Sequence, residues 1–311
     1  MPDYIFGPVL SSRLGRSLGI DLLGGRICSF DCLYCESGPT LHKTMERKNY
    51  ADPGSVLAEF KDWLAENPET EPDHITLGGE GEPCLNLGLG EIIHGVKKLA
   101  PHIPVAVLTN SSLLADAQVR KELMQADTLL PSLDTLIQDE FLLLNRPCCG
   151  LQIHDIIRGL QLFCNDFSGQ VLLEILLVSG INDSLENLEK TALFIKDLQH
   201  QRVDLTCMSR PGAHIKQKAP DHKTLQDWRQ TLKAAIRSVQ VRQKHPVKKR
   251  SARPSTILDS IRRRPQTLQQ ICTALGTAPG ETATVLETLA GNGEIQVHDN
   301  GKHKFYIIKG N

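Results

Sequence analysis

Apolar segments rich in valine, isoleucine and leucine alternate with helical stretches from residue 18 to about residue 208. This alternation is typical of β–α units that surround a parallel sheet. We expect six strands, at residues 18–23, 74–77, 105–108, 128–133, 171–178 and 203–208. Between them we expect five helices, at residues 53–66, 89–99, 116–125, 154–163 and 185–198. In parallel sheets built this way, functional residues gather at the carboxyl ends of the strands.

Three cysteines, Cys28, Cys32 and Cys35, form a C-x3-C-x2-C loop with Tyr34 just before the last thiol. A loop this short can bring three thiolates onto three corners of one iron–sulfur cube, with no fourth ligand of the same kind. The fourth iron then stays open to a substrate or cofactor. The alternatives are a zinc site that His42 closes, a disulfide that leaves one thiol over, and three unligated thiols.

A glycine-rich turn follows the second predicted strand, where Gly78, Gly79 and Glu80 open a stretch that ends at Pro83. Glycines let backbone carbonyls approach a ligand closely, and a carboxylate or carbonyl accepts hydrogen bonds from an ammonium group. Alone, such a motif is more often an ordinary turn. It gains weight from the cysteine loop upstream, because the two signals are independent.

The two motifs together resemble those of the radical S-adenosylmethionine (radical SAM) enzymes. The resemblance implies a partial (β/α)6 barrel of the TIM type, with a [4Fe–4S] cluster on the three cysteines. It also implies that Tyr34 and the turn at 78–80 position S-adenosylmethionine. In this family an electron from a reduced flavodoxin or ferredoxin cleaves that cofactor to methionine and a 5′-deoxyadenosyl radical, which abstracts hydrogen from the substrate.

The N-terminal stretch from Tyr4 to Asp21 resembles one branch of the family, the iron–sulfur oxidoreductases related to the wyosine-tRNA enzyme. This resemblance covers residues 4–215. The wyosine-forming enzyme carries a second cluster on cysteines upstream of the radical SAM motif. This chain has no cysteine before Cys28, so pyruvate condensation on a tRNA guanine is not implied.

Polar residues also end the later strands and are candidates for contact with the cofactor. Asn110 follows the third strand, Ser132 and Asp134 end the fourth, and Asn182 follows the fifth. Hydroxyl and carboxylate groups can bond ribose, and an amide offers both a donor and an acceptor to adenine or a carboxylate. Read alone, each of these stretches is also an ordinary turn.

Further residues are candidates for contact with the substrate. Cys84 follows the glycine-rich turn and could donate a hydrogen atom, although unpaired cysteine is commonly a small buried apolar residue. Glu174 interrupts an apolar strand, so it faces either solvent or the barrel interior. Arg210 follows the sixth strand and could bind a carboxylate or phosphate. Adjacent Cys148 and Cys149 could ligate a second cluster.

Composition sets the expected environment of the chain. No apolar run approaches the length of about 18 residues that a membrane-spanning helix needs, and the N-terminus lacks a basic region followed by an apolar one. Nine cysteines spread through 311 residues are typical of reduced thiols. We therefore expect a cytoplasmic protein with no membrane partner.

Charge is unevenly distributed along the chain. Eleven Lys and Arg residues lie between Lys233 and Arg264, against a single acid, Asp259. The formal charge of the whole chain is −1, so this net +10 leaves the other residues at −11. The basic segment is either a solvated linker or a contact for a phosphate backbone, which would gain from counterion release.

The last part of the chain changes character. We expect short helices at 255–263 and 267–275, the second with a capping box at Thr267 and Gln270, and a third helix at 280–289. Two strands, 294–298 and 304–308, flank an Asp-Asn-Gly hairpin turn. This pattern resembles a winged helix, a module that often binds nucleic acid through its third helix. That helix has no Lys or Arg.

These observations predict three regions: a radical SAM barrel at 1–220, a helix and basic linker at 221–253, and a winged-helix-like domain at 254–311. The first functional hypothesis is radical modification of RNA or tRNA, from the branch resemblance, the basic segment and the C-terminal module. The second is radical modification or activation of a protein or peptide. The third is a redox-sensing, DNA-binding regulator, which would not need the cofactor turn.

Overall fold

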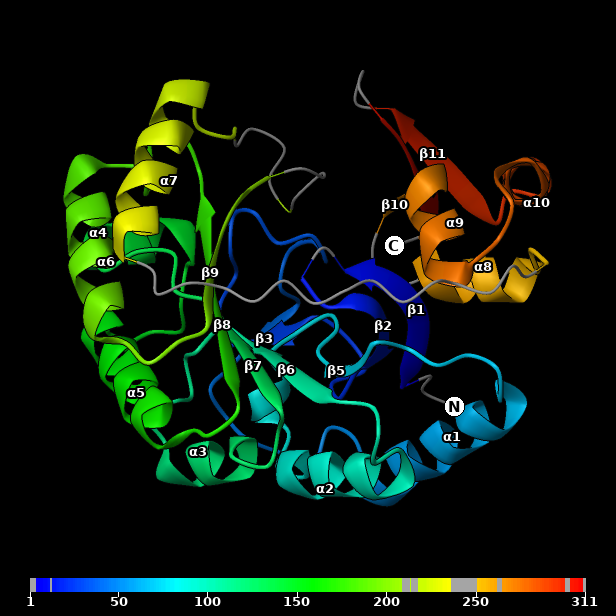
Figure 1. Cartoon of the computed structure of the whole chain (residues 1–311), viewed down its shortest axis with the longest axis horizontal. Helices are drawn as coiled ribbons and strands as arrows, with labels where there is room; N and C mark the ends of the chain where they lie inside the picture. Colours follow the sequence, from blue (N-terminus) through cyan, green and yellow to red (C-terminus); the bar gives the residue numbers. More distant parts are fainter. Residues whose placement is uncertain are drawn as a thin grey trace.

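The computed structural model describes residues 4–11, 13–208, 213, 218–235, 251–261, 265–299 and 303–309. Its main sheet has the strand order β1-β2-β5-β6-β7-β8-β9 and curls into a half-barrel (Figure 1). The strands are β1 (Ile5–Ser11), β2 (Gly15–Ile20), β5 (His74–Leu77), β6 (Val105–Thr109), β7 (Thr128–Pro131), β8 (Gln170–Leu177) and β9 (Arg202–Cys207). β2 and the strands after it run parallel, whereas β1 pairs antiparallel with β2. The α/β class and the parallel half-barrel predicted from the sequence are thus confirmed.

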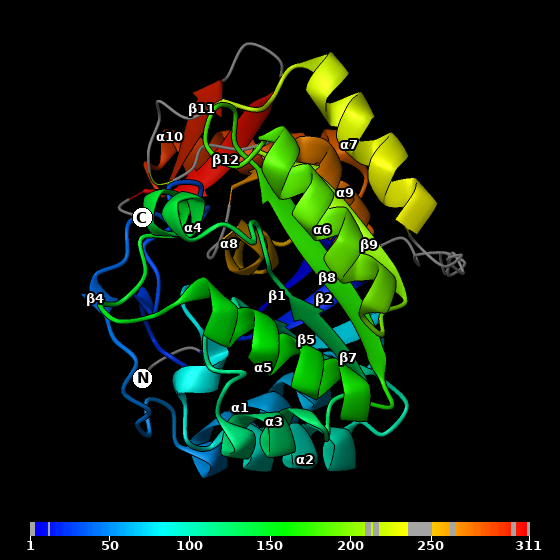
Figure 2. The same cartoon turned by 90° about the vertical axis from the view of Figure 1, so that its left-hand side faces the viewer.

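Helices cover the convex face of this sheet (Figure 2). They are α1 (Pro53–Glu66), α2 (Leu89–Leu99), α3 (Ala117–Leu123), α4 (Gln138–Leu144), α5 (Ile153–Asp166), α6 (Leu185–Asp197) and α7 (His222–Ala235). α7 buries Trp228 and Leu232 in the same core as the barrel. Within the described residues, none of the helices combines the length and the apolar character needed to cross a membrane.

Local sequence explains where several helices begin. Asp52 accepts a hydrogen bond from the Ser55 amide at 2.9 Å, and Pro53 follows it as the first helical residue of α1. A proline there loses no hydrogen bond, because the first amides of a helix have no partner within the helix. The Asp116 and Ser184 side chains cap α3 and α6 in the same way.

The two faces of the sheet differ, as β8 illustrates. Ile175 and the alternate residues on its face are buried among the helix-packed core, whereas Glu174 and Leu176 on the other face are only half buried. A small separate apolar cluster of Leu14, Ala106, Leu130 and Leu172 lies on that second face. Successive side chains of a strand point to opposite faces, so Glu174 faces the inside of the half-barrel.

The C-terminal module has its own core and packs on the edge strand β1. It contains α8 (Pro254–Ile261), β10 (Gln266–Thr267), α9 (Leu268–Leu275), α10 (Pro279–Gly291), β11 (Ile295–Asp299) and β12 (Lys304–Ile308). Leu10 of β1 packs against the module's core, and the buried Ser260 hydroxyl donates to the Pro8 carbonyl at 3.1 Å. The predicted capping box of Thr267 and Gln270 is present. The winged-helix assignment and the three predicted domain boundaries stay predictions, and residues 236–250 of the basic linker lie outside the described residues.

Candidate functional site

The cysteine loop begins in a two-residue strand, β3 (Ile27–Cys28), which pairs in parallel with β4 (His42–Lys43). In this register Cys28 lies opposite Lys43, and Ile27 lies opposite His42. Successive side chains of a strand point to opposite faces, so His42 points away from the Cys28 thiol. This arrangement disfavours the zinc site that His42 would have to close.

The three thiols are set in a protein environment that disfavours thiolates. Burial raises the pKa of Cys28 to about 12, and the Glu82 carboxylate adds to the effect. Burial likewise raises the pKa of Cys32 and of Cys35. A bound metal centre supplies the positive charge that such thiols need to ionise. Among the described residues, no three His, Cys, Asp or Glu side chains are grouped closely enough to hold a single metal ion.

Amide donors lie against two of the three sulfurs. The Asn110 Nδ2 atom donates to Cys28 Sγ at 3.3 Å, and the Asn145 Nδ2 atom donates to Cys32 Sγ at 3.4 Å. Hydrogen bonds of this kind are part of how proteins hold iron–sulfur clusters. The donor set, three half-buried thiols with amides aimed at two of the sulfurs, therefore fits a cluster.

The glycines of the turn after β5 are packed closely against neighbouring segments. A Cβ atom at Gly79 would lie 2.5 Å from the Asp21 side chain, and one at Gly81 would lie 1.9 Å from the Ile27 carbonyl oxygen. Gly78 would touch Leu108 at 3.2 Å. The glycines are needed here because neighbouring segments, including the one that leads into Cys28, occupy the space of a side chain. Glu80 is half buried in this turn.

Glu82 is a central residue of the site that the sequence did not single out. Its buried carboxylate accepts hydrogen bonds from the Cys84 amide at 3.1 Å, the Thr109 hydroxyl at 2.8 Å and the Asn110 amide at 2.7 Å. Burial raises its pKa despite these donors. Glu82 thus ties the turn after β5 to the end of β6. A second acid two residues after Glu80 was the only sequence signal.

Asp134 forms the second buried polar centre, just after β7. Its carboxylate accepts from the Tyr34 hydroxyl at 2.5 Å, from Asn145 at 2.9 Å and from the Leu176 amide at 2.9 Å. Burial raises its pKa to about 6. Tyr34 and Asp134, predicted separately, are therefore in direct contact, and Asn145, which was not predicted, joins them.

The other predicted cofactor residues have different surroundings. The Asn182 amide donates to the Asp134 and Leu176 carbonyls, both at 2.8 Å, and its oxygen accepts from the Val178 amide at 2.8 Å. The polar atoms of the Asn182 side chain are therefore bonded to the backbone around the ends of β7 and β8. Ser132 is half buried, and its backbone lies opposite Glu174. Their contacts with S-adenosylmethionine stay predictions.

The predicted substrate residues are scattered. Cys84 is fully buried with its thiol 3.6 Å from the Thr109 hydroxyl, and burial holds its pKa well above the usual value. Glu174 forms an ion pair with Arg13 inside the half-barrel. Arg210 lies outside the described residues.

The vicinal cysteines lie beside the cluster loop. The Cys148 amide donates to the Ser29 carbonyl at 2.9 Å, and Cys149 is exposed. Both thiols are unpaired. Ligation of a second cluster by Cys148 and Cys149 stays a prediction.

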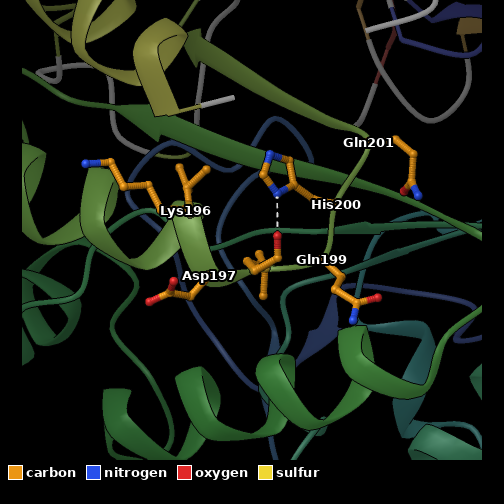
Figure 3. Close-up of a pocket in the computed structure, with 7 residues that line it drawn as sticks. Lys196, Asp197, Gln199, His200 and Gln201 are labelled. Carbon is orange, nitrogen blue, oxygen red and sulfur yellow. Dashed lines mark hydrogen bonds between the residues drawn. The ribbon is translucent and has the colours of Figure 1, made fainter. Parts of the chain in front are cut away.

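A surface pocket lies elsewhere, between α6 and β9. It has a volume of about 530 Å³ and is lined by residues 195–201 (Figure 3). Its histidine, His200, contacts the Leu198 carbonyl through Nδ1 at 2.9 Å. The pocket precedes β9, whereas the cluster loop and its partners follow strand ends, and it contains none of the predicted site residues.

Comparison with known proteins agrees with this geometry. The model of the radical SAM superfamily matches residues 22–195. The chain is 30% identical over 298 residues to a protein named GTPase Obg from Brachyspira hyodysenteriae, a match that covers 94% of this chain and 43% of that protein. It is 41% identical over 184 residues to a UPF0026 protein from Synechocystis, covering 59% of this chain and 68% of that protein.

A solved structure extends the comparison to the fold. A radical SAM methyltransferase from Sphaerobacter thermophilus superposes with a TM-score of 0.57 at 20% identity, covering 73% of this chain and 65% of the methyltransferase. At that identity the likeness concerns the fold alone. The chain therefore belongs to the radical SAM superfamily, whose enzymes use a [4Fe–4S] cluster and S-adenosylmethionine, and within it to the UPF0026 proteins.

Proposed function

We propose that this chain cleaves S-adenosylmethionine reductively and uses the resulting radical to modify an RNA, with tRNA as the first candidate. Cys28, Cys32 and Cys35 would hold the cluster. When bound, the cluster and S-adenosylmethionine supply the chemistry, one electron and a 5′-deoxyadenosyl radical that abstracts hydrogen. The three half-buried thiols, two of them with amide donors, support this proposal.

The chain's own residues would shape the site around that chemistry. The contact between Tyr34 and Asp134 fixes the cluster loop to the end of β7. Glu82 fixes the turn that carries Glu80 to the end of β6. Because both carboxylates are almost fully buried, these contacts also exclude water from the base of the site.

The observation that favours RNA is the basic segment from Lys233 to Arg264, with eleven cations and one acid in a chain whose remaining residues sum to −11. A polyanion gains from such a segment through counterion release, whereas the acidic body repels it. An RNA would therefore be held by this segment and present one nucleotide to the half-barrel.

The test is anaerobic. After cluster reconstitution, dithionite and S-adenosylmethionine are added, and 5′-deoxyadenosine is measured with and without bulk tRNA. We expect tRNA to raise the rate, and we expect Glu80→Gln to lower deoxyadenosine formation in both conditions. No deoxyadenosine from a chain with an intact cluster would refute the proposed function and favour the redox-sensing regulator.

Charge reversal identifies the binding segment. Changing the three cations at 248–250 to Glu should abolish the increase with tRNA and leave the rate without RNA unchanged. The control changes exposed Lys61, Lys98 and Lys121 to Glu, which alters the net charge equally on helices α1, α2 and α3. A rate indifferent to tRNA in the unmodified chain would contradict the RNA assignment.

A second candidate, a protein or peptide substrate, is favoured by the surface of α10. The exposed side chains of this helix include Glu281, Thr284, Glu287 and Thr288, and it has no Lys or Arg. An acidic helix face repels phosphates and suits a basic protein surface. Deoxyadenosine formation that is stimulated by a cell-protein fraction, but not by RNA, would favour this candidate.

A flavodoxin or ferredoxin is the proposed electron donor. Exposed Lys43 lies opposite Cys28 in the β3–β4 pair, so a donor docked there would be close to the cluster loop. Such donors are acidic, and a cation at the contact would steer them. Lys43→Glu should slow the reaction driven by flavodoxin more than the dithionite reaction, which reports the loss of the Lys43 hydrogen bonds to the Arg146 and Pro147 carbonyls.

A further inference from the structure

Two asparagines connect the thiols of the cluster loop to carboxylates that are almost completely buried. Asn110 comes from the end of β6, and Asn145 follows α4. The carboxylates, Glu82 and Asp134, are 2% and 4% exposed. Each asparagine thus bonds both a cluster-loop thiol and a buried carboxylate.

The first chain runs from Glu82 through Asn110 to Cys28. The Asn110 backbone amide donates to Glu82 at 2.7 Å, and its side-chain amide donates to Cys28 Sγ at 3.3 Å and to the Ser29 hydroxyl at 2.9 Å. The Asn110 side-chain oxygen accepts from the Ser112 amide at 3.0 Å. This last contact fixes which end of the amide faces the thiol, because only the NH2 end can donate.

The second chain runs from Asp134 through Asn145 to Cys32. The Asn145 NH2 group lies 2.9 Å from the Asp134 carboxylate, 3.4 Å from Cys32 Sγ and 3.4 Å from the Tyr34 oxygen. An NH2 group has two hydrogens, so one goes to the carboxylate and the other is directed at the sulfur and the tyrosine oxygen. Asn145 itself is 4% exposed.

We propose that Asn110 and Asn145 are positioning residues that set the reduction potential of the cluster, balanced by Glu82 and Asp134. Reduction adds one electron from a solution donor, which makes the cluster and its thiolates more negative. An amide hydrogen aimed at a thiolate sulfur stabilises that added charge and raises the potential. A buried carboxylate that accepts from the same asparagine, from the Asn110 backbone amide or the Asn145 NH2 group, opposes it and lowers the potential, because a low-dielectric interior screens charge weakly.

The two kinds of residue therefore act with opposite sign, which a merely structural role would not produce. Asn145→Leu removes the donor at similar volume and should lower the potential. Asp134→Asn removes the charge at the same size and should raise it. Hydrogen bonds to charged groups are among the stronger ones, so we expect a change of about 10- to 100-fold in the ratio of reduced to oxidised cluster at fixed solution potential.

The measurement is an anaerobic redox titration of the reconstituted full-length chain, followed by the spectrum of the reduced cluster, without S-adenosylmethionine or substrate. Asn86→Ala is the matched control, because Asn86 is fully buried and donates to the Ala51 carbonyl at 3.1 Å, away from the thiols. It should lower thermal stability and leave the potential unchanged. If Asn145→Leu takes up no cluster, Asp134→Asn and Asn110→Leu decide the sign.

Equal potentials in all variants, or shifts of the same sign in Asn145→Leu and Asp134→Asn, would overturn the inference. It rests on the cluster of the proposed function, and the two can fail separately. A cluster whose potential responds as expected but which never cleaves S-adenosylmethionine would refute only the proposed function. A chain that takes up no cluster would overturn both.

Discussion

Replacing Gly81 with alanine should displace the segment that carries the first cluster cysteine. A Cβ atom at this position would lie 1.9 Å from the Ile27 carbonyl oxygen and 2.5 Å from a methyl group of Leu23. Real Cβ contacts essentially never fall below 3.0 Å, so Ile27 and the turn must separate by the difference. The Glu82 amide donates to that same carbonyl at 3.1 Å and would lose this hydrogen bond.

The expected cost combines overpacking with the lost bond. Overpacking costs about 1–3 kcal/mol and a backbone hydrogen bond about 1 kcal/mol, which gives about 2–4 kcal/mol of unfolding free energy. The displacement also reaches Cys28, the residue after Ile27. Since a misplacement of about 1 Å can cost about 100-fold in rate, deoxyadenosine formation should fall much further than stability predicts.

The assay compares Gly81→Ala with Gly25→Ala. Gly25 lies in the same segment two residues before Ile27, and a Cβ atom there would meet no heavy atom within 4 Å. Urea unfolding, iron content after reconstitution and deoxyadenosine yield are measured anaerobically for both. Equal stability and iron content in the two variants would refute the packing argument.

Further predictions concern the polar groups. The folded chain holds the Asp134 proton more tightly than the unfolded chain, since the pKa is raised from 3.8 to about 6. This contribution to stability is therefore complete below about pH 4 and is lost as pH rises to 6, by about 3 kcal/mol, and urea unfolding of Asp134→Asn should lack that slope. Cys28→Ser should reduce bound iron, whereas Cys84→Ser should keep it, by iron analysis and absorbance. Arg13 and Glu174 are about one-fifth exposed, so a double-mutant cycle should give a coupling of about 1 kcal/mol, and additive single effects would contradict the ion pair.

Elements with local signals were predictable from the sequence. Residues 53–66 and 89–99 were predicted to the residue, the first because Asp52 and Pro53 mark its start. β1 was not predicted, because Gly7 and Pro8 interrupt it and its register shifts between Phe6 and Val9. Helix α4 also went unpredicted, since it has only seven residues, too few for a clear periodic pattern, and no side chain caps it.

Some residues of the candidate site were likewise predictable from the sequence, and others were not. Strand-end positions such as Asn110 and Asp134 followed from topology, because the ends of parallel strands meet at one edge of the sheet. Their partners did not follow. Asn145 reaches the site only because residues 144–148 run beside the cluster loop, where the Asp31 amide donates to the Asn145 carbonyl at 3.0 Å. Contacts between segments so far apart in sequence leave no periodic pattern to read.

The packing of the C-terminal module on β1 has a consequence for truncated forms of this chain. β1 is the outermost strand of its sheet, and an uncovered strand edge is a template for pairing with another molecule. A fragment that ends before Pro254 would expose Leu10 and leave the Pro8 carbonyl without the Ser260 hydroxyl. Such a fragment should self-associate, whatever its chemistry. Point substitutions on the module's surface, which leave its packing on β1 in place, are therefore a better way than truncation to ask what else it binds.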